Sequence, residues 1–375
     1  MSIFITGANG YLGSYVVNEM VARTRKKLLL MVRGDTHEDR VTKLWKGMQL
    51  HMDPPAFRAL LDRCELIHGD LHAPNLGWND ATWRSMSRRI TSIVHIAASL
   101  NRKSAKACFN TNLRGGLSVL KLGRAVADRG KLERYSFVST VAVAGHRNSE
   151  DISEDDAIEW SRSDYDPYAR TKKFGEHMVR ELLEGESFVI FRPAILLGDG
   201  EHDRTTQFDM VRALVGLADM PIVPLKPTDR IDIVNTSYAG KAIAHIHLMS
   251  QPSWDTYHLS AGAKSPTAHD ILEALRPVGS KARLLPAVET PFDWVFRAMN
   301  RAPRGTTVAG IGALMKVFWP YIKYDTVFLN DRVVHELGEE PVPFVNYAAD
   351  LYTWVKANRF RYPYTQLSNP IEEPA

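Results

Sequence analysis

The chain has 375 residues, of which 45% are hydrophobic and 24% are charged, as in an ordinary globular protein with a large core. The formal net charge of +4 is small for this length, and the basic residues do not cluster with aromatic residues, so we expect no nucleic-acid partner. Cys64 and Cys108 have neither a disulfide framework nor a metal-ligand spacing, which predicts two core thiols, no metal site and a reducing, cytoplasmic environment.

Two features bear on membrane association. The first predicted strand begins at residue 2, so we expect no signal or transit peptide. No stretch reaches the ~20 apolar residues that a transmembrane helix needs. The longest weakly polar stretch, residues 306–319, is interrupted by Gly310, Gly312 and Lys316. We interpret it as a core or substrate-tunnel segment, with peripheral membrane contact as the alternative.

The first predicted unit is a strand, a glycine turn and a helix. An apolar run at residues 3–5 is followed by three glycines and then by an apolar-periodic segment. Gly7 allows the tight turn, Gly10 lets the backbone approach a pyrophosphate, and Gly13 permits close packing of helix on strand. The diphosphate of a dinucleotide would lie at the helix N-terminus. The residues expected to bind it are Thr6, Gly7, Asn9, Gly10, Tyr11, Leu12 and Gly13.

The glycine spacing selects a subtype of this unit. Two successive intervals of three residues after a threonine differ from the GxGxxG fingerprint and resemble the extended short-chain dehydrogenase/reductase superfamily. The resemblance implies an α/β fold, a Rossmann-type doubly wound parallel sheet with a smaller, mostly helical C-terminal substrate-binding lobe.

The second predicted strand, residues 28–32, indicates which dinucleotide binds. It is a continuous apolar run, typical of a strand buried on both faces of a parallel sheet, and Arg33 follows it directly. Folds that prefer NAD usually carry a carboxylate here for the ribose hydroxyls. A guanidinium instead suits a 2′-phosphate, and Lys43 could supply a second charge, which predicts NADPH as the cofactor. The alternative is an exposed arginine in a loop.

Residues at the ends of the third and fourth predicted strands, 64–68 and 93–98, are also expected to contact the cofactor. The resemblance places Asp70 and Leu71 beside the adenine ring, although a turn aspartate explains Asp70 equally well. The small side chains of Ala97 and Ala98 fit a backbone packed against the cofactor. His95 lies among apolar residues and is predicted to be a core histidine.

A tyrosine and a lysine open the long helix predicted from residue 168 to 183. Tyr168 and Lys172 are four residues apart and therefore share one helix face. A phenol has a pKa of about 10, and a neighbouring ammonium would lower that pKa. A hydroxyl at the end of the fifth predicted strand, residues 135–138, would hold a substrate carbonyl. Counting back from Gly145, as in the superfamily, puts this hydroxyl on Thr140, with Ser139 as the alternative.

Three further positions follow from the resemblance. An asparagine at the place of Asn112 ties the active-site backbone to a water near the catalytic lysine, although a local bond within a helix would also explain Asn112. Pro193 and Ile195 follow the sixth predicted strand, residues 188–191, and would lie against the nicotinamide carboxamide.

The domain organisation is also an expectation. We expect residues 1–200 to form an NADP-binding Rossmann domain to which residues 229–260 return through short strands at 230–234 and 257–260. Residues 201–228 and 261–375 would form the substrate-binding lobe. Its aromatic residues could line a hydrophobic acyl pocket, although such residues are more often plain core. They are Phe292, Trp294, Phe296, Phe318, Trp319, Tyr321 and Phe328.

Two segments narrow the resemblance to one branch. Residues 31–44, MVRGDTHEDRVTKL, resemble the "VRA…RL" segment of thioester reductases, a group that includes carboxylic acid reductase domains and fatty acyl-CoA reductases. Residues 69–77, GDLHAPNLG, resemble their "GDL…P.LGL" segment. Three positions depart from the usual pattern, at Gly116, Thr171 and Asn235. None of these departures removes a predicted catalytic group.

The resemblance implies a concrete reaction. Such a reductase uses NADPH to reduce an acyl thioester, held on coenzyme A or an acyl carrier protein, to an aldehyde or alcohol. Thr140 and Tyr168 would bind the developing oxyanion, and Tyr168 would donate the proton with Lys172 lowering its pKa. The chain opens at the cofactor strand, so we expect its substrate to come from a partner or from free acyl-CoA.

Two alternatives remain open. A ketone or aldehyde reductase, or another extended dehydrogenase or epimerase, would use the same Thr140, Tyr168 and Lys172. A non-catalytic NADP(H)-sensing protein is the second alternative, and the presence of all three side chains argues against it.

Overall fold

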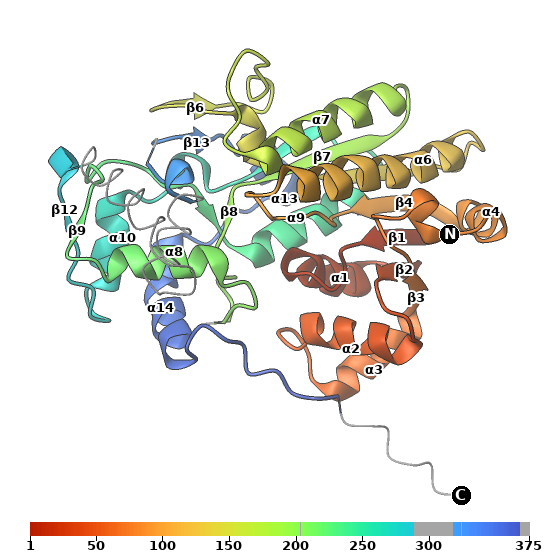
Figure 1. Cartoon of the computed structure of the whole chain (residues 1–375), viewed down its shortest axis with the longest axis horizontal. Helices are drawn as coiled ribbons and strands as arrows, with labels where there is room; N and C mark the ends of the chain where they lie inside the picture. Colours follow the sequence, from red (N-terminus) through yellow and green to blue (C-terminus); the bar gives the residue numbers. More distant parts are fainter. Residues whose placement is uncertain (203, 289–317, 324, 368–375) are drawn as a thin grey trace, which may run out of the picture.

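The computed structural model describes residues 1–202, 204–288, 318–323 and 325–367. Its centre is a seven-stranded parallel sheet with the strand order β11-β7-β5-β4-β1-β2-β3 (Figure 1). The order reverses between β1 and β4, as in a doubly wound Rossmann sheet, so the predicted fold class is confirmed. The strands are β1 (Ser2–Thr6), β2 (Lys27–Val32), β3 (Cys64–His68), β4 (Ile90–His95), β5 (Arg134–Val138), β7 (Phe188–Pro193) and β11 (Thr256–Leu259).

Alternation along the strands divides the apolar side chains between two cores. Ile3 and Ile5 face a core formed with Val16 and Val17 of the first helix, whereas Phe4 faces the opposite core with Val119. Because both faces are covered, the strands are apolar at consecutive positions rather than at alternate ones.

Helices cover both faces of the sheet (Figure 1). The first face carries α1 (Tyr11–Arg23), α2 (His37–Met48), α3 (Pro54–Arg63) and α9 (Thr236–Leu248). The second carries α4 (Asp80–Arg89), α6 (Gly116–Ala127) and α7 (Pro167–Leu182). Between β4 and α6, the short α5 (Ala105–Cys108) continues into a π-helix, Phe109–Gly115. Cys64 and Cys108 are both buried free thiols, as predicted.

The smaller lobe lies beside the sheet and has its own core (Figure 1). The side chains that fill this core include Val211, Leu275, Phe344 and Leu351. The lobe is mostly helical, in agreement with the predicted fold class. Among the described residues, the lobe contains α8 (Asp209–Ala218), α10 (Ala268–Leu275), α14 (Ala348–Ala357), β8 (Ile195–Leu196) with β10 (Ile233–Val234), and β9 (Ile222–Val223) with β12 (Arg283–Leu284).

The predicted return of residues 229–260 to the large sheet is only half right. The strand β11 joins the sheet, but β10 pairs with β8 in a separate two-stranded sheet. Strand β7 is already paired with β5 on one edge and with β11 on the other, and β10 pairs instead with β8, the strand that directly follows β7.

The predicted extent of the lobe, residues 261–375, also needs correction. Helix α13 (Asp331–Leu337) returns to the sheet domain, where Val333 joins the core beside α9 and β11. Strand β13 (Val327–Phe328) pairs with β6 (Asp151–Ile152). The chain after α14 runs back past α2, where Trp45 Nε1 donates a 3.0 Å hydrogen bond to the Thr365 carbonyl (Figure 1). These segments return because their apolar residues complete cores of the first domain.

Some predictions fall outside the described residues. Phe292, Trp294 and Phe296 lie there, as does residue range 306–317 of the weakly polar stretch. Among the helices that the structure does describe, none is both long enough and apolar enough to cross a lipid bilayer.

Candidate active site

A large cavity opens where the strand order reverses, at the carboxyl ends of β1, β2, β4, β5 and β7. Its volume is about 850 Å³, within the range of small-molecule sites. Every predicted cofactor or catalytic residue except Thr6 and Asn112 lines it. These lining residues are Gly7, Asn9, Gly10, Tyr11, Leu12, Gly13, Arg33, Lys43, Asp70, Leu71, Ala97, Ala98, Thr140, Tyr168, Lys172, Pro193 and Ile195.

The glycine turn forms the floor of this cavity. Gly7 has a φ of +78°, and a side chain there would meet the backbone nitrogen of Ala97 at 2.7 Å. A Cβ on Gly13 would lie 1.9 Å from the Gly7 carbonyl oxygen, so the turn and the helix can approach only without it. Helix α1 begins at Tyr11, and its N-cap residue Gly10 makes no side-chain cap. The first amide groups of α1 are therefore available to an anion.

Thr6 lies behind the cavity wall rather than on it. Its Oγ1 is 2.7 Å from His95 Nδ1 and accepts a 3.2 Å hydrogen bond from the Ala97 amide, which positions the exit of β4. Burial lowers the pKa of His95 to about 3, so the ring is neutral at physiological pH. His95 is thus the core histidine that the apolar pattern predicts.

Asn112 does not line the cavity but holds segments that do. Its Oδ1 accepts a 2.7 Å hydrogen bond from the Ser99 amide, and its Nδ2 donates to Thr171 Oγ1 at 3.0 Å. The side chain therefore ties the exit of β4 to α7. Asn112 lies in the π-helix, a rare geometry that often occurs at functional sites.

The end of β2 carries two cations. Arg33 and Lys43 are exposed and line the cavity, and no ion pair joins either of them to another residue within the described ranges. Nearby, Asp70 Oδ1 accepts a 3.0 Å hydrogen bond from the His72 amide. Asp70 therefore has the geometry of a turn aspartate and lines the cavity as well.

The start of α7 places Tyr168 and Lys172. Asp166 caps the helix by accepting a 2.9 Å hydrogen bond from the Ala169 amide, and Pro167 occupies the first turn, where a missing N–H costs nothing. Lys172 is buried, and its Nζ donates a 2.6 Å hydrogen bond to the Val138 carbonyl. Burial lowers the pKa of Lys172 to about 7.

The phenol of Tyr168 is neutral at physiological pH. Burial raises its pKa above the usual value, whereas the positive charge of Arg102 and a hydrogen bond with Thr140 lower it. The main cation that acts on this pKa is therefore Arg102 rather than Lys172. This differs from the expectation that Lys172 would be the neighbouring charge.

Two residues with hydroxyl side chains, Ser139 and Thr140, directly follow β5. Thr140 Oγ1 accepts a 3.3 Å hydrogen bond from the Ala142 amide, and it lies 3.5 Å from the Pro193 carbonyl oxygen. Ser139 Oγ is buried and has no hydrogen-bond partner among the described residues. Both line the cavity. Thr140 also bonds to the Tyr168 hydroxyl.

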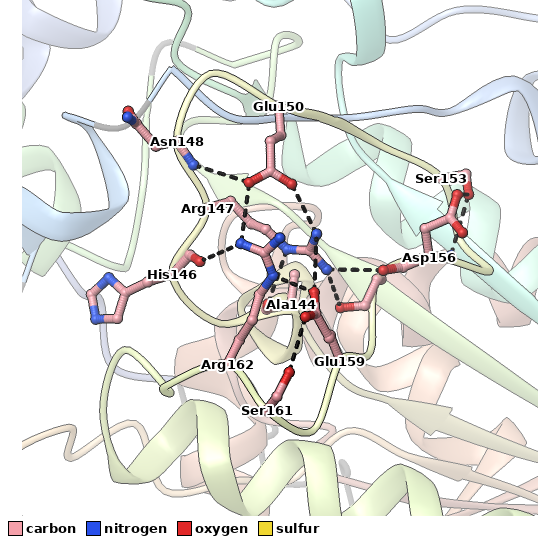
Figure 2. A network of polar contacts seen from close by, with 11 residues as sticks. Ala144, His146, Arg147, Asn148, Glu150, Ser153, Asp156, Glu159, Ser161 and Arg162 are labelled. Carbon is pink, nitrogen blue, oxygen red and sulfur yellow. Dashed lines mark hydrogen bonds and ion pairs between the residues drawn. The ribbon is translucent and has the colours of Figure 1, made fainter.

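A network of charged side chains holds the loop between Thr140 and Tyr168 (Figure 2). Arg147 is buried, forms a 2.9 Å ion pair with Glu150 and donates a 2.9 Å hydrogen bond to the Asp156 carbonyl. Arg162 bonds to Glu150 at 3.2 Å and also contacts Glu159. Because the loop is held at several points, the two predicted catalytic segments keep a defined separation.

A second, fully buried pair fixes α7 against the sheet. Arg192 of β7 binds Glu176 of α7 through Nη2 at 2.7 Å and through Nε at 3.0 Å. Its Nη1 donates a 2.7 Å hydrogen bond to the Glu154 carbonyl. Arg192 is therefore structural.

The cavity is also lined by residues of the lobe and of the loop after β4, and the sequence patterns did not assign Gln207, Met210 or Arg102 to the site. Gln207, Met210, Phe318 and Tyr321 line the cavity from the lobe, and Arg102 lines it from the loop after β4. Of the aromatic residues proposed for a substrate pocket, Phe318 and Tyr321 line the cavity, whereas Trp319 and Phe328 are buried in cores. No local pattern marks Arg102, because its partners are distant in sequence.

The fold and the site together define a class of protein. A doubly wound sheet, a threonine followed by three glycines at intervals of three, and a Tyr-x-x-x-Lys helix beside a hydroxyl-bearing strand end are the features of extended short-chain dehydrogenases/reductases. A family model described as "Male sterility protein" matches residues 5–243, and the chain belongs to this family of NAD-binding proteins. The predicted superfamily is confirmed, and its cofactor is a nicotinamide dinucleotide.

Relatives and solved structures agree with this assignment. A linear gramicidin synthase protein of Brevibacillus parabrevis is 25% identical over 297 residues, which are 78% of this chain and 6% of that protein. Carboxylic acid reductase of Mycobacterium marinum is 27% identical over 287 residues, 69% of this chain and 24% of that protein. The chain thus spans a small part of these relatives. The terminal R domain of the myxalamid PKS-NRPS pathway shares the fold, with a TM-score of 0.81, 23% identity, and coverage of 96% of this chain and 91% of that domain.

Proposed function

We propose that this protein is an NADPH-dependent reductase of acyl thioesters, in which Thr140, Tyr168 and Lys172 act on the thioester carbonyl. The observation that carries the proposal is the convergence of these three side chains on the cavity that the glycine turn also lines. The product would be an aldehyde, or an alcohol after a second reduction. We assign cofactor binding to the sheet domain and substrate binding mainly to the lobe.

The residues of the cavity fit a nicotinamide dinucleotide phosphate. The open N-terminus of α1 suits the diphosphate, and the side-chain-free positions Gly7 and Gly13 let the backbone approach it. Arg33 and Lys43 suit a 2′-phosphate because both are exposed cations at the end of β2. When bound, the reduced cofactor supplies the hydride that attacks the carbonyl carbon.

The side chains of the site would then act on the carbonyl oxygen. Thr140 and Tyr168 bind this oxygen as negative charge develops on it. Tyr168, which burial keeps protonated, transfers its phenolic proton to the oxygen. The resulting hemithioacetal collapses to an aldehyde and a thiol. Lys172, held by the Val138 carbonyl, is available to the cofactor ribose.

The names of the relatives favour a thioester substrate on a carrier. One relative is named a carboxylic acid reductase, another belongs to a linear gramicidin synthase, and one solved structure is titled a thiolation-reductase di-domain. An acyl carrier protein or coenzyme A would therefore present the acyl group to this chain.

A small second cavity supports an apolar acyl group. It has a volume of about 40 Å³, and the side chains that line it within the described residues are all apolar. Ile195 and Met210 line both this cavity and the large one, so the two adjoin. An aliphatic tail could extend from the reacting carbonyl into the core of the lobe.

The experiment that tests the proposal is NADPH oxidation followed by absorbance with separate substrates. A long-chain acyl-CoA, the same acyl group on a carrier protein, the matching aldehyde and a β-ketoacyl thioester are offered in turn. Consumption of NADPH with the acyl thioester, together with release of free thiol, is expected. Turnover of the ketone or aldehyde alone would contradict thioester reduction and favour a carbonyl reductase with the same side chains.

A further inference from the structure

Arg102 occupies an unusual position beside the proton donor. Its guanidinium carbon lies 4.8 Å from the centre of the Tyr168 ring, 5.1 Å from that of Tyr321 and 5.3 Å from that of Phe318. A guanidinium that stacks on aromatic faces is attracted to them and is held in place by them. Arg102 therefore brings a positive charge to the ring whose hydroxyl lies in the cavity.

Three parts of the molecule hold this side chain. Arg102 Nε lies 3.3 Å from Asp166 Oδ2 and donates to the Tyr321 hydroxyl at 3.4 Å. The Tyr321 hydroxyl in turn donates a 2.7 Å hydrogen bond to Asp166 Oδ2, while Asp166 Oδ1 caps α7 by accepting from Ala169. The arginine thus connects the loop after β4, the first turn of the catalytic helix and the lobe.

The terminal nitrogens of Arg102, Nη1 and Nη2, donate no hydrogen bond to another of the described residues. Arg102 also lines the large cavity. The carboxylate of Asp166 is shared with Tyr321 and with the helix cap, so it does not occupy these nitrogens. The charge of Arg102 is therefore directed toward the site.

We propose that Arg102 is a positioning residue for Tyr168, whose fixed positive charge stabilises the phenolate that proton transfer leaves behind. The proposal rests on the proposed function. In the step concerned, the O–H bond of Tyr168 breaks and a new O–H bond forms on the substrate oxygen. The electron pair of the broken bond stays on the phenol oxygen until solvent returns a proton.

The groups around Tyr168 differ in how they respond to pH. Arg102, Asp166 and Cys108 act on the pKa of Tyr168 directly. Lys172 lies one turn further along α7, and Tyr321 bonds to both Arg102 and Asp166. Burial lowers the pKa of Lys172 to about 7, so in the cofactor-free protein its charge is largely lost above neutral pH. A guanidinium keeps its charge at all working pH values, so we expect Arg102 to matter most in alkaline solution.

The first test compares Arg102→Gln and Arg102→Lys. Without the cation the phenol is a weaker acid, so Arg102→Gln should lower kcat about tenfold and move the alkaline limb of its pH profile up by about one unit. The Arg102→Lys variant should fall between this variant and the parent, while KM and NADPH affinity change little. An unchanged alkaline limb would overturn the proposal. If KM were raised as well, Arg102 would bind substrate, and if KM were unchanged, Arg102 would have only a structural role.

Two controls separate electrostatics from damage to the fold. Arg124→Gln removes an arginine and its surface ion pair with Asp128, and it should leave the pH profile as in the parent. Tyr321→Phe keeps the ring but removes the hydroxyl that binds Arg102, so it should move the alkaline limb in the same direction by a smaller amount.

A second measurement needs no substrate. Tyrosines replaced by 3-fluorotyrosine titrate at lower pH and can be followed by fluorine NMR in the cofactor-free protein, with Tyr168→Phe assigning the signal. The Arg102→Gln variant should raise the pKa of residue 168, and an unchanged pKa would overturn the proposal. This result stands even if the parent protein reduces no acyl thioester, which would contradict only the proposed function.

Discussion

Lys172 Nζ on α7 donates a 2.6 Å hydrogen bond to the carbonyl oxygen of Val138, the last residue of β5. The same ammonium lies 4.8 Å from the centre of the Phe137 ring. These contacts join the helix that carries Tyr168 to the strand whose exit carries Thr140. The lysine therefore aligns the two segments before any cofactor binds.

Removing the phenolic hydroxyl tests the proton donor. We expect Tyr168→Phe to abolish turnover and to leave NADPH affinity nearly intact, since the ring remains and only the transferable proton is lost. Steady-state rates and fluorescence titration with NADPH check both parts. Tyr364→Phe, at an exposed tyrosine, is the matched control. A rate close to that of the parent would remove Tyr168 as the donor.

The cofactor preference should depend on Arg33. We expect Arg33→Ala to weaken NADPH binding by about ten- to a hundredfold, because a charge-assisted bond to the 2′-phosphate is lost, and to leave NADH binding nearly unchanged. Arg25→Ala, an exposed arginine just before β2, should change neither affinity. Equal losses for both cofactors would show that Arg33 does not contact the 2′-phosphate.

The two hydroxyls at the end of β5 can be separated by mutation. Thr140→Ala should lower kcat by about a hundredfold or more, as loss of an oxyanion donor does elsewhere. Ser139→Ala should have a small effect, and comparison of the two rates decides the assignment. A silent Thr140→Ala with an inactive Ser139→Ala would mean that Ser139, whose buried Oγ has no partner among the described residues, is the carbonyl-binding hydroxyl.

We expect Lys172 to lower the unfolding free energy of the cofactor-free protein. Burial lowers its pKa to about 7, below the ~10.4 of an unfolded lysine, so between these values the unfolded chain binds more protons. Unfolding free energy should therefore rise with pH from 7 to 10. Lys172→Met should be more stable than the parent by a few kcal/mol at pH 6–7, with the difference shrinking toward pH 10. Urea unfolding at several pH values measures this, and an unchanged or lower stability at pH 6–7 would contradict it.

The buried pair of Arg192 and Glu176 should be important for stability. We expect Glu176→Gln to cost about 3–5 kcal/mol of unfolding free energy, because the guanidinium is left buried without its counter-charge. The matched control is Asp255→Asn, which breaks an exposed ion pair with Arg180. Arg180 lies on α7, as Glu176 does, and this variant should lose about 0–1 kcal/mol of unfolding free energy. Similar losses for both variants would show that burial does not distinguish the two pairs.

Local patterns predicted most strands of the sheet and many of the residues that line the large cavity. Gly7, Gly10 and Gly13 act within one turn, and the apolar runs of β1 and β2 need no distant information to be recognised. Strands β3, β4 and β5 also contain charged or polar residues. The strand at residues 230–234 was predicted for the wrong sheet, because it pairs with β8 and no local pattern shows which strand will be its partner. The return of Val333 and Thr365 to the first domain depended likewise on surfaces provided by other elements.

By itself, the sequence determined the class of fold, the glycine turn and the Tyr168–Lys172 helix face, because each of these is encoded by residues close together in the chain. Only the tertiary structure decided what surrounds Tyr168. Tyr321 bonds to Asp166 across 155 positions and to Arg102 across 219, separations at which no pattern indicates a contact. The reason is physical: a side chain's charge environment depends on every element packed around it, and packing is settled only when the whole chain folds.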